Sequence, residues 1–431
     1  MQTRFTAEQL ADPDVRDAER NIRACVHCGF CLATCPTYTL LGDELDSPRG
    51  RIYLIKDMLE YERPPAPEVV KHIDRCLSCL ACMTACPSGV HYMHLVDHAR
   101  ARIEADYVRP RLDRWLRAFL ASLVPHNARF RWALRAARFA KPLAPVLTAL
   151  RLKRLAAMLR LVPARLPPAP AKTGRVIAAE GAREGRVALL AGCVSPVLRP
   201  SINEAAIRLL TRHGFEVVVV EGCCGSLVHH LGQEHEALAA ARARVDALTP
   251  EIGEGLDAVL VTASGCGTTV KDYGFMLRGD SAYASNAAAV SALTRDISEY
   301  LAGLALTPTA ESDALVVAYH GACSLEHGQK IGREPRQLLC RMGFTVRDIS
   351  EGHLCCGSAG IYNILQPDIA KRLRERKVGN IEKLAPNVIA AGNIGCITQI
   401  AAATAIPVVH TVELIDWKTG GRKPEALGNS A

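Results

Sequence analysis

Eight of the 17 cysteines fall into two copies of one short pattern, and this pattern constrains the chain more than any other feature. Each copy has three cysteines separated by two residues, then a fourth after three residues, followed directly by proline. The copies are Cys25, Cys28, Cys31 and Cys35, and Cys76, Cys79, Cys82 and Cys86. Thiolates at this spacing hold [4Fe-4S] clusters, whereas structural zinc sites typically pair two CxxC units. The sequence therefore predicts two [4Fe-4S] clusters.

The fourth cysteine of each copy is expected to serve the other cluster, as in two-cluster ferredoxins. Three cysteines at this spacing wrap three corners of a cube, while the fourth, held rigid before proline, points away. We therefore assign Cys25, Cys28, Cys31 and Cys86 to one cluster. Cys76, Cys79, Cys82 and Cys35 are assigned to the second.

The segment between the two cysteine runs, Pro36 to Arg75, predicts a helical domain. Apolar residues recur at helical period from Arg51 to Tyr61. A compact β-hairpin ferredoxin leaves no room for such a helix, so residues 1–108 are predicted to form an α-helical 2[4Fe-4S] ferredoxin-type domain. Arg49 and Arg51 are candidates to neutralise cluster charge, and the alternative is that they are solvated cations at the start of a helix.

Eight of the nine remaining cysteines, all except Cys340, mark an internal repeat. Cys193, Cys223, Cys224 and Cys266 recur as Cys323, Cys355, Cys356 and Cys396 at offsets of 130 to 132 residues. The expected strands are 186–191, 215–220 and 258–262 in the first copy, and 315–319, 344–349 and 388–391 in the second. Helices are expected between them, at 203–213 and 234–248 and at the matching places of the second copy. This alternation predicts two α/β domains with parallel sheets, over 173–305 and 306–431.

Each repeated cysteine lies just beyond the carboxyl end of an expected strand, where open α/β sheets bind their ligands. The eight repeated cysteines are therefore candidates for a third cluster. The alternatives are a scaffold that keeps its cysteines without metal, or a different ligand set. His320, Cys323 and His327 follow a strand end and are candidates to ligate metal or to bond a quinone carbonyl. His229 and His230 follow the first Cys-Cys-Gly, and for every one of these histidines a hydrogen-bonded structural role is the alternative.

Positive charge is concentrated in one segment, which excludes a generally basic nucleic-acid-binding surface. Residues 100–165 contain 16 Lys or Arg and three acidic residues, a balance of +13, while the whole chain carries +8. Aromatic residues alternate with arginines at helical spacing in 114–124 and 130–139. We expect residues 109–172 to form a basic helical bridge with a proline-rich linker at 163–171. The bridge either contacts an anionic membrane or acidic partner, or simply joins the two halves.

Membrane spans and a secretory signal are not expected. No apolar run approaches the about 18 to 20 residues that span a bilayer, and the first ten residues include Glu8 and no apolar signal core. The expected location is cytoplasmic, with peripheral contact to the inner membrane. In that reducing compartment an odd number of clustered cysteines favours metal over disulfides.

The usual signatures of a cofactor enzyme are missing from the sequence. Residues 253–258 match GxGxxA but precede a strand instead of following one, and neither a P-loop nor HExxH occurs. A chain that binds clusters without a flavin or nicotinamide site relays electrons for a partner, because another cofactor must perform the two-electron chemistry.

The Cys-Cys-Gly motifs resemble those of CCG-domain proteins, a family that also contributes a subunit to the heterodisulfide reductases. Together with the dicluster region, the segments 353–367 and 392–400 narrow the resemblance to the family of iron-sulfur subunits of bacterial glycolate oxidase. The resemblance implies an FAD-containing partner that oxidises glycolate to glyoxylate, a second flavoprotein-like subunit, and the quinone pool as eventual acceptor.

One departure from the wider CCG family bears on the cofactor. The heterodisulfide-reductase type closes each copy with CxxC, whereas Cys266 and Cys396 stand alone. This departure disfavours unusual non-cubane clusters and a catalytic subunit that itself reduces a disulfide. The equivalent subunit of a lactate or glycerol-3-phosphate dehydrogenase and a zinc-stabilised adaptor remain as alternatives.

Overall fold

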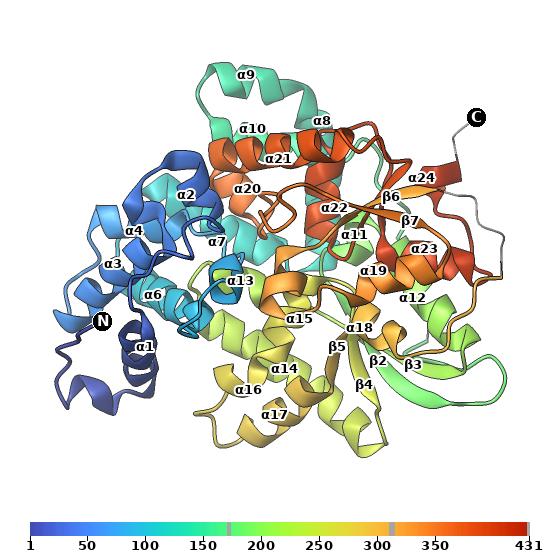
Figure 1. The fold of residues 1–431 in the computed structure, drawn as a ribbon, viewed down its shortest axis with the longest axis horizontal. Coiled ribbons are helices and arrows are strands. Elements are labelled where there is room, and N and C mark those ends of the chain that lie inside the picture. Colours follow the sequence, from blue (N-terminus) through green and yellow to red (C-terminus); the bar gives the residue numbers. More distant parts are fainter. Residues whose placement is uncertain (170–173, 310–314, 429–431) are drawn as a thin grey trace.

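A computed structural model of the chain describes residues 1–169, 174–309 and 315–428. Residues 1–169 form helices joined by turns and loops, and two sheets surrounded by helices make up the remainder (Figure 1). This confirms the expected fold class. The sheets fall within 173–305 and 306–431, the ranges expected for the two repeats. The expected boundary at residues 172 and 173 lies outside the described residues.

The N-terminal part is built from eight short helices, four of which begin at proline. They are η1 (Gln9–Ala11), α1 (Pro13–Ala24), α2 (Pro36–Leu41), η2 (Glu44–Asp46), α3 (Pro48–Glu60), α4 (Pro67–Asp74), α5 (Ala81–Thr84) and α6 (Tyr92–Asp106). Proline suits the first helical position because its φ is already helical and its missing N–H has no partner there. Pro36 follows Cys35 directly, so the start of α2 fixes the direction of that thiol. The expected helix at 51–61 is α3, which starts three residues earlier, where Ser47 caps it.

The first sheet has the strand order β1-β3-β2-β4-β5. Its strands are β1 (Val176–Ile177), β2 (Gly185–Gly192), β3 (Phe215–Glu221), β4 (Ala258–Val261) and β5 (Thr294–Asp296), all parallel to their neighbours except β1. The helices are α11 (Ser195–Leu198), α12 (Ser201–Arg212), α13 (Ser226–His230), α14 (Glu234–Gly253), α15 (Ser264–Lys271), α16 (Tyr273–Met276), α17 (Ala284–Leu293) and α18 (Ile297–Ala302).

The second sheet has the strand order β7-β6-β8-β9, which corresponds to β3-β2-β4-β5 of the first sheet. All its strands are parallel. Its strands are β6 (Val316–His320), β7 (Thr345–Asp348), β8 (Val388–Ala391) and β9 (Val408–His410). Its helices are α19 (Glu334–Arg341), α20 (Tyr362–Leu365), α21 (Pro367–Glu382), α22 (Ile394–Ala401), α23 (Thr411–Lys418) and α24 (Glu425–Gly428), with a π-helical turn at Ser324–Gly328. The six expected strands are confirmed, and each sheet gains a further parallel strand of three residues, β5 or β9.

The two repeats pack against each other through one shared apolar core. Buried residues of β2, α12, β6 and α23 belong to a single cluster. Asp416 of α23 is fully buried and accepts hydrogen bonds from Arg208 and Arg212 of α12, at 2.7 and 2.9 Å. At the strand ends, Ser264 donates its N–H to the carbonyl of Gly392. The cysteine-bearing edges of the two sheets therefore lie side by side.

Helices of the basic segment bridge the two halves of the chain. They are α7 (Arg111–Leu123), α8 (Asn127–Ala140), η3 (Lys141–Leu143), α9 (Ala144–Ala149) and α10 (Lys153–Arg160), with α10 beside α21 (Figure 1). Leu116 and Leu120 of α7 pack with Leu231 of the first repeat and Ile364 of the second. The bridging role expected for this segment is thus present.

Several cations of the basic segment are used inside the molecule. Arg109 and Arg117 both donate to Asp74 of α4, at 2.7 and 2.8 Å. Arg131 donates to the carbonyls of Pro167 and Pro196. The excess charge counted in the sequence is therefore only partly a surface property. None of the helices that the structure describes is long and apolar enough to cross a membrane.

Candidate metal centres

The first group of predicted ligands lines one cavity near the surface. Cys25, Cys28, Cys31 and Cys86 border a hollow of ≈ 440 Å³. Cys28 is exposed, whereas Cys25 is buried at the end of α1. Val26 and Phe30 beside it are each 65% exposed. Burial raises the pKa of Cys31 to about 11, so an ionised thiol here needs compensating positive charge.

The second group lines a cavity deeper in the molecule. Cys35, Cys76, Cys79 and Cys82 border a hollow of ≈ 310 Å³ that also includes Arg51 and Tyr92. All four cysteines are buried. Burial is the main cause that raises the pKa values of Cys79 and Cys82 well above that of a free thiol. A coordinating metal removes this penalty, since metal-bound thiols are deprotonated outright.

The crossed assignment of the fourth cysteines stays a prediction, since Cys82 borders both cavities. Cys86 lines the cavity of the first run, and Cys35 lines that of the second. The chain reverses direction at Ser78 and Leu80, which have positive φ values of 48° and 62°. This local winding brings three thiols of the second run toward one centre. Four thiol donors around one hollow are the donor set of a [4Fe-4S] cluster.

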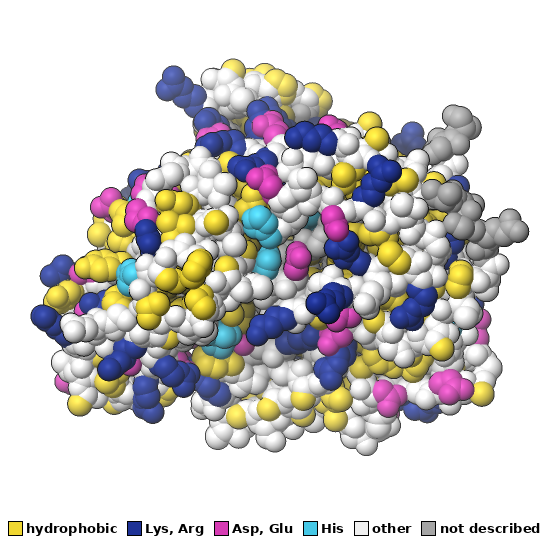
Figure 2. All heavy atoms as spheres, viewed as in Figure 1, with side chains coloured by type: hydrophobic (Ala, Val, Ile, Leu, Met, Phe, Trp, Pro, Cys, Tyr) yellow, Lys and Arg dark blue, Asp and Glu magenta, His cyan; other side chains and the backbone are white. Residues whose placement is uncertain are grey.

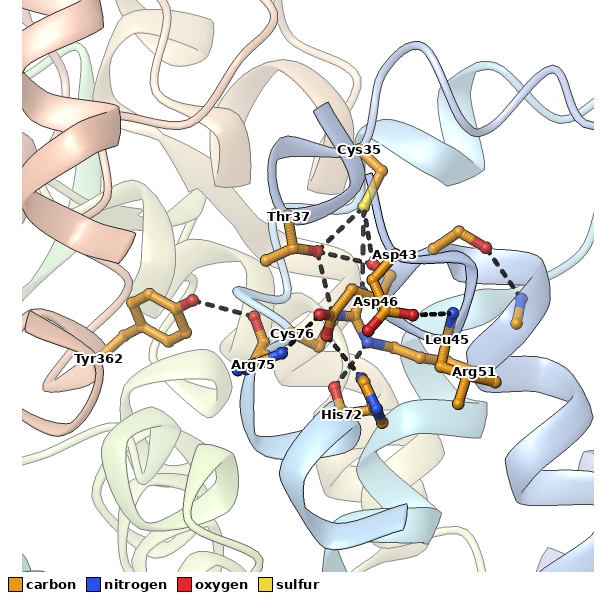
Figure 3. Close-up of polar contacts among 12 residues, drawn as sticks. Cys35, Thr37, Asp43, Leu45, Asp46, Arg51, His72, Arg75, Cys76 and Tyr362 are labelled. Carbon is orange, nitrogen blue, oxygen red and sulfur yellow. Dashed lines mark hydrogen bonds and ion pairs between the residues drawn. The ribbon is translucent and has the colours of Figure 1, made fainter. Parts of the chain in front are cut away.

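Arg51 is the centre of a charged network beside the second cavity (Figure 3). Its guanidinium is 1% exposed and donates to the His72 carbonyl at 2.7 Å and to Asp46 at 3.3 Å. One of its nitrogens lies 3.9 Å from the Cys35 sulfur. Burial alone would lower the pKa of Arg51, but the neighbouring thiols and Asp46 raise it overall. Arg51 therefore stays charged where thiolates gather.

Asp46 holds this network together. It is fully buried, and its two oxygens also accept from Arg75 at 2.7 Å and contact His72 Nδ1 at 2.9 Å (Figure 3). Two arginines around one carboxylate leave a positive excess inside the protein, which suits a cluster whose thiolates make it anionic. Arg49, in contrast, is partly exposed and pairs with Glu44 at 2.6 Å on the rim of the first cavity.

The repeated cysteines form two groups of four. In the first repeat, the thiol of Cys223 interacts with those of Cys193 and Cys224, and Cys224 with Cys266. In the second, Cys323 donates to Cys355 at 3.8 Å, Cys355 interacts with Cys356, and Cys356 with Cys396. Each group joins loops from three strand ends, as the sequence predicted.

The glycine of each Cys-Cys-Gly motif is required by the backbone. Gly225 and Gly357 both have φ of +85°, and each donates its N–H to the first sulfur of its motif at 3.4 Å. A Cβ on Gly357 would lie 2.6 Å from the carbonyl oxygen of Ala370. The motif thus combines a turn that favours glycine with close helix contact and a hydrogen bond to sulfur.

A cation accompanies each of these groups, half-buried in the first repeat and buried in the second, and the sequence analysis missed both. Arg244 of α14 lies beside Cys223 and helps to lower that thiol's pKa to about 3, after its contacts with Cys193 and Cys224. Lys377 of α21 is 2% exposed beside Cys355 and Cys356; burial lowers its pKa while these thiols oppose the change. The signal available in the sequence was a basic residue about 20 positions after each cysteine pair.

The candidate histidines differ in their surroundings. His327 contacts Thr84 Oγ1 at 3.0 Å and the His353 carbonyl at 3.2 Å, a structural role that ties α5 to the second repeat. His229 pairs with Asp97 at 3.2 Å. His320 is 1% exposed, and burial lowers its pKa to about 3, so its imidazole is neutral.

The second repeat lies directly against the second dicluster cavity. Cys79 shares one buried apolar cluster with Cys355 and with the half-buried Cys323. Tyr362 of α20 donates its hydroxyl to the Arg75 carbonyl at 3.0 Å (Figure 3). The first cavity, the second cavity and the thiols of the second repeat therefore form a series that runs from the surface inward.

Comparisons with known proteins agree with this arrangement. Residues 21–90 match the 4Fe-4S dicluster domain, and residues 187–271 and 317–401 match the cysteine-rich domain. The chain is similar to the glycolate oxidase iron-sulfur subunit of Escherichia coli K12, with 42% identity over 96% of this chain and 98% of that one. It is 31% identical to the probable glycolate oxidase iron-sulfur subunit of Bacillus subtilis 168, over 89% of each chain.

More distant similarity covers less of the chain or only the fold. Lactate utilization protein A of Exiguobacterium is 25% identical over 53% of this chain and 96% of its own. The crystal structure of a hypothetical protein from Helicobacter pylori shares the fold with a TM-score of 0.56 at 10% identity, over 97% of this chain and 74% of that one.

Separate replacement of Arg51 and Arg49 by glutamine tests the network around Asp46. Arg51→Gln leaves a buried carboxylate with one fewer cation, so we expect the free energy of the first unfolding transition in urea to fall by about 3–5 kcal/mol. Arg49→Gln removes only a partly exposed pair and should cost at most about 1 kcal/mol. Equal destabilisation by both changes would contradict the network's role.

Proposed function

We propose that this chain, which belongs to the family of glycolate oxidase iron-sulfur subunits, relays electrons from a flavoprotein subunit toward the quinone pool. In the proposal, an FAD-containing partner oxidises glycolate to glyoxylate, and a second flavoprotein-like subunit completes the complex. The observation that carries the relay is the series of thiol groups from an exposed edge to the interior. Full-length similarity to two glycolate oxidase subunits favours glycolate over lactate as the partner's substrate.

The two dicluster cavities are proposed to hold the clusters. Cys25, Cys28, Cys31 and Cys86 would ligate the first, and Cys76, Cys79, Cys82 and Cys35 the second. When bound, [4Fe-4S] clusters accept and donate one electron at a time. The chain's own residues exclude water from the second site, hold the thiols in position through α2 and the turn at Leu80, and place Arg51 beside them.

The surface around Cys28 is proposed to receive the flavoprotein. Val26 and Phe30 flank this exposed ligand, and Tyr53 of α3 is 58% exposed nearby, with its ring edge against His27. Exposed aromatic and aliphatic side chains beside a redox centre are suited to a partner interface, whose centres are enriched in aromatic residues. Electrons would therefore reach this chain at the first cavity.

Single ligand replacements test the relay and the crossed assignment together. Cys86→Ser should remove about four iron atoms per chain and the magnetic resonance signal of the first cluster, and Cys35→Ser should do the same for the second. In the complex, glycolate should still reduce the flavin, while quinone reduction falls to background. Cys340→Ser, at an exposed cysteine outside all four groups, is the control.

Two outcomes would contradict these proposals. If Cys86→Ser and Cys28→Ser abolish different signals, the crossed assignment is wrong. If the isolated chain oxidises glycolate without a flavoprotein, or if quinone reduction survives loss of both clusters, the relay is wrong.

A charge at the surface near Cys28 tests the proposed flavoprotein contact. Phe30→Glu should weaken binding of the flavoprotein by about tenfold or more, because hot-spot aromatics contribute roughly 2 kcal/mol or more. Iron content should stay the same, since Phe30 is no ligand. Val176→Glu on β1, in the first repeat, is the matched control. Unchanged affinity for Phe30→Glu would place the partner elsewhere.

Helices α8 and α9 are proposed to contact an anionic membrane surface. Trp132, Phe139, Leu143 and Val146 are all more than half exposed, and the upper edge of Figure 2, over α9, shows apolar side chains with basic ones beside them. Arg135 lies over the Trp132 ring at 5.1 Å. No Asp or Glu occurs between Asp113 and Glu180, so helices α8 and α9 carry no acidic side chain that would repel lipid phosphates.

Vesicle binding tests this surface. The combined change Trp132→Ser, Arg135→Gln and Phe139→Ser should reduce sedimentation with anionic vesicles by about tenfold or more, since each basic residue near the surface contributes up to about 1 kcal/mol. The intact chain's binding should weaken with salt. Tyr61→Ser, at an exposed tyrosine of the N-terminal part, is the control. If the intact chain does not bind anionic vesicles at low salt, the membrane contact is wrong and the surface of α8 and α9 faces another subunit.

A further inference from the structure

His320 is a buried polar side chain without a partner. It is the last residue of β6 and is 1% exposed, and neither ring nitrogen finds a hydrogen bond among the described residues. Leaving a buried polar group unpaired costs roughly 1–3 kcal/mol, so an orphaned imidazole requires an explanation. His327, seven residues later, has both nitrogens engaged, which shows that the fold can satisfy a histidine in this region.

The open nitrogens of His320 lie among thiols. One ring nitrogen and the sulfurs of Cys356 and Cys396 are all within 4.8 Å of one another, and all three residues are buried. Cys323 and Cys355 belong to the same thiol group. Imidazole nitrogen and thiolate sulfur together are characteristic metal donors.

A buried cation adjoins this donor set. The ammonium group of Lys377 donates to two carbonyls in the turn before Cys355, those of Glu351 and Gly352, each at 3.0 Å. It lies on α21, close enough to Cys355, Cys356 and Cys396 for their charge to affect its pKa. A fixed cation here compensates ionised thiolates, the form in which they bind metal.

The first repeat lacks the imidazole. The offset of 130 that relates Cys193 to Cys323 places Leu190 at the position of His320. Leu190 is 2% exposed in the core of the first sheet. At this position the duplicated sites therefore differ in one donor, a histidine nitrogen present in the second repeat.

We propose that the second repeat holds its own iron-sulfur centre, with His320 as a nitrogen ligand beside Cys356 and Cys396. The inference rests on the proposed relay, because such a centre would receive electrons through the buried cluster that Cys355 shares with Cys79. One electron would leave the second dicluster site, which is oxidised, and reduce this centre, with no atom transferred. A neutral imidazole carries one negative charge fewer than a thiolate, so reduction becomes easier and the potential rises, as in Rieske centres. Electrons are then drawn inward from the dicluster.

Isotope labelling of histidine tests the ligand directly. The full chain, grown with ¹⁵N-histidine and purified without oxygen, should show a histidine-nitrogen coupling on a third reduced signal in pulsed electron paramagnetic resonance. His320→Leu, which copies the first repeat, should abolish that coupling and leave the dicluster signals intact. His327→Leu is the control and should keep it. His320→Cys should retain iron at the site with a lower midpoint potential.

The results separate this inference from the relay. Two dicluster signals without a histidine-coupled third signal, or with the coupling retained in His320→Leu, would overturn the His320 assignment and leave the relay intact. Stoichiometric zinc at the site would overturn the iron-sulfur centre. Absence of the dicluster iron itself would instead contradict the proposed function.

Discussion

A thiolate removed from water is stable only beside positive charge, and the architecture of this chain follows from that constraint. The second dicluster cavity has Arg51, buried and paired with Asp46. The repeats have Arg244 and Lys377, each on the second helix after its Cys-Cys-Gly turn. The first cavity is the least enclosed and has the partly exposed Arg49 on its rim. The depth of each cation thus matches the burial of its thiols.

Duplication explains how so many thiols come close together. A parallel sheet directs all its loops at one edge, so three strand ends supply four cysteines in each repeat. The shared core and the Asp416 pairs then fix the two edges side by side. The N-terminal part contacts both repeats, through Asp97 and His229 in one and through Thr84 and His327 in the other. Of the repeated cysteines, however, those that share an apolar cluster with Cys79 belong to the second repeat.

The sequence was sufficient to predict those features whose determining contacts are local or periodic. The doubled cysteine run, the cysteine register of the repeat and strands of four or more residues could be recognised, because each leaves a pattern within a short window. β5 and β9 have three residues each, too few to show a period. His320 and His327 looked equivalent in the sequence. The contact of Thr84 with His327 joins residues 243 positions apart, and such pairing leaves no local signal.

The basic segment shows that the sequence also gives no signal for ion pairs between distant residues. The same pairs hold the series of thiol groups in place. Its arginines appeared as one surface, yet Arg109 and Arg117 converge on Asp74, two residues before Cys76. Arg154 of α10 pairs with Asp113 and donates to the Leu365 carbonyl of the second repeat. These buried and half-buried pairs tie the second cysteine run, the bridge and the second repeat into one unit. Because separation of Cys79 from Cys355 would require breaking several of these pairs at once, the bridge would support the proposed relay without supplying a ligand.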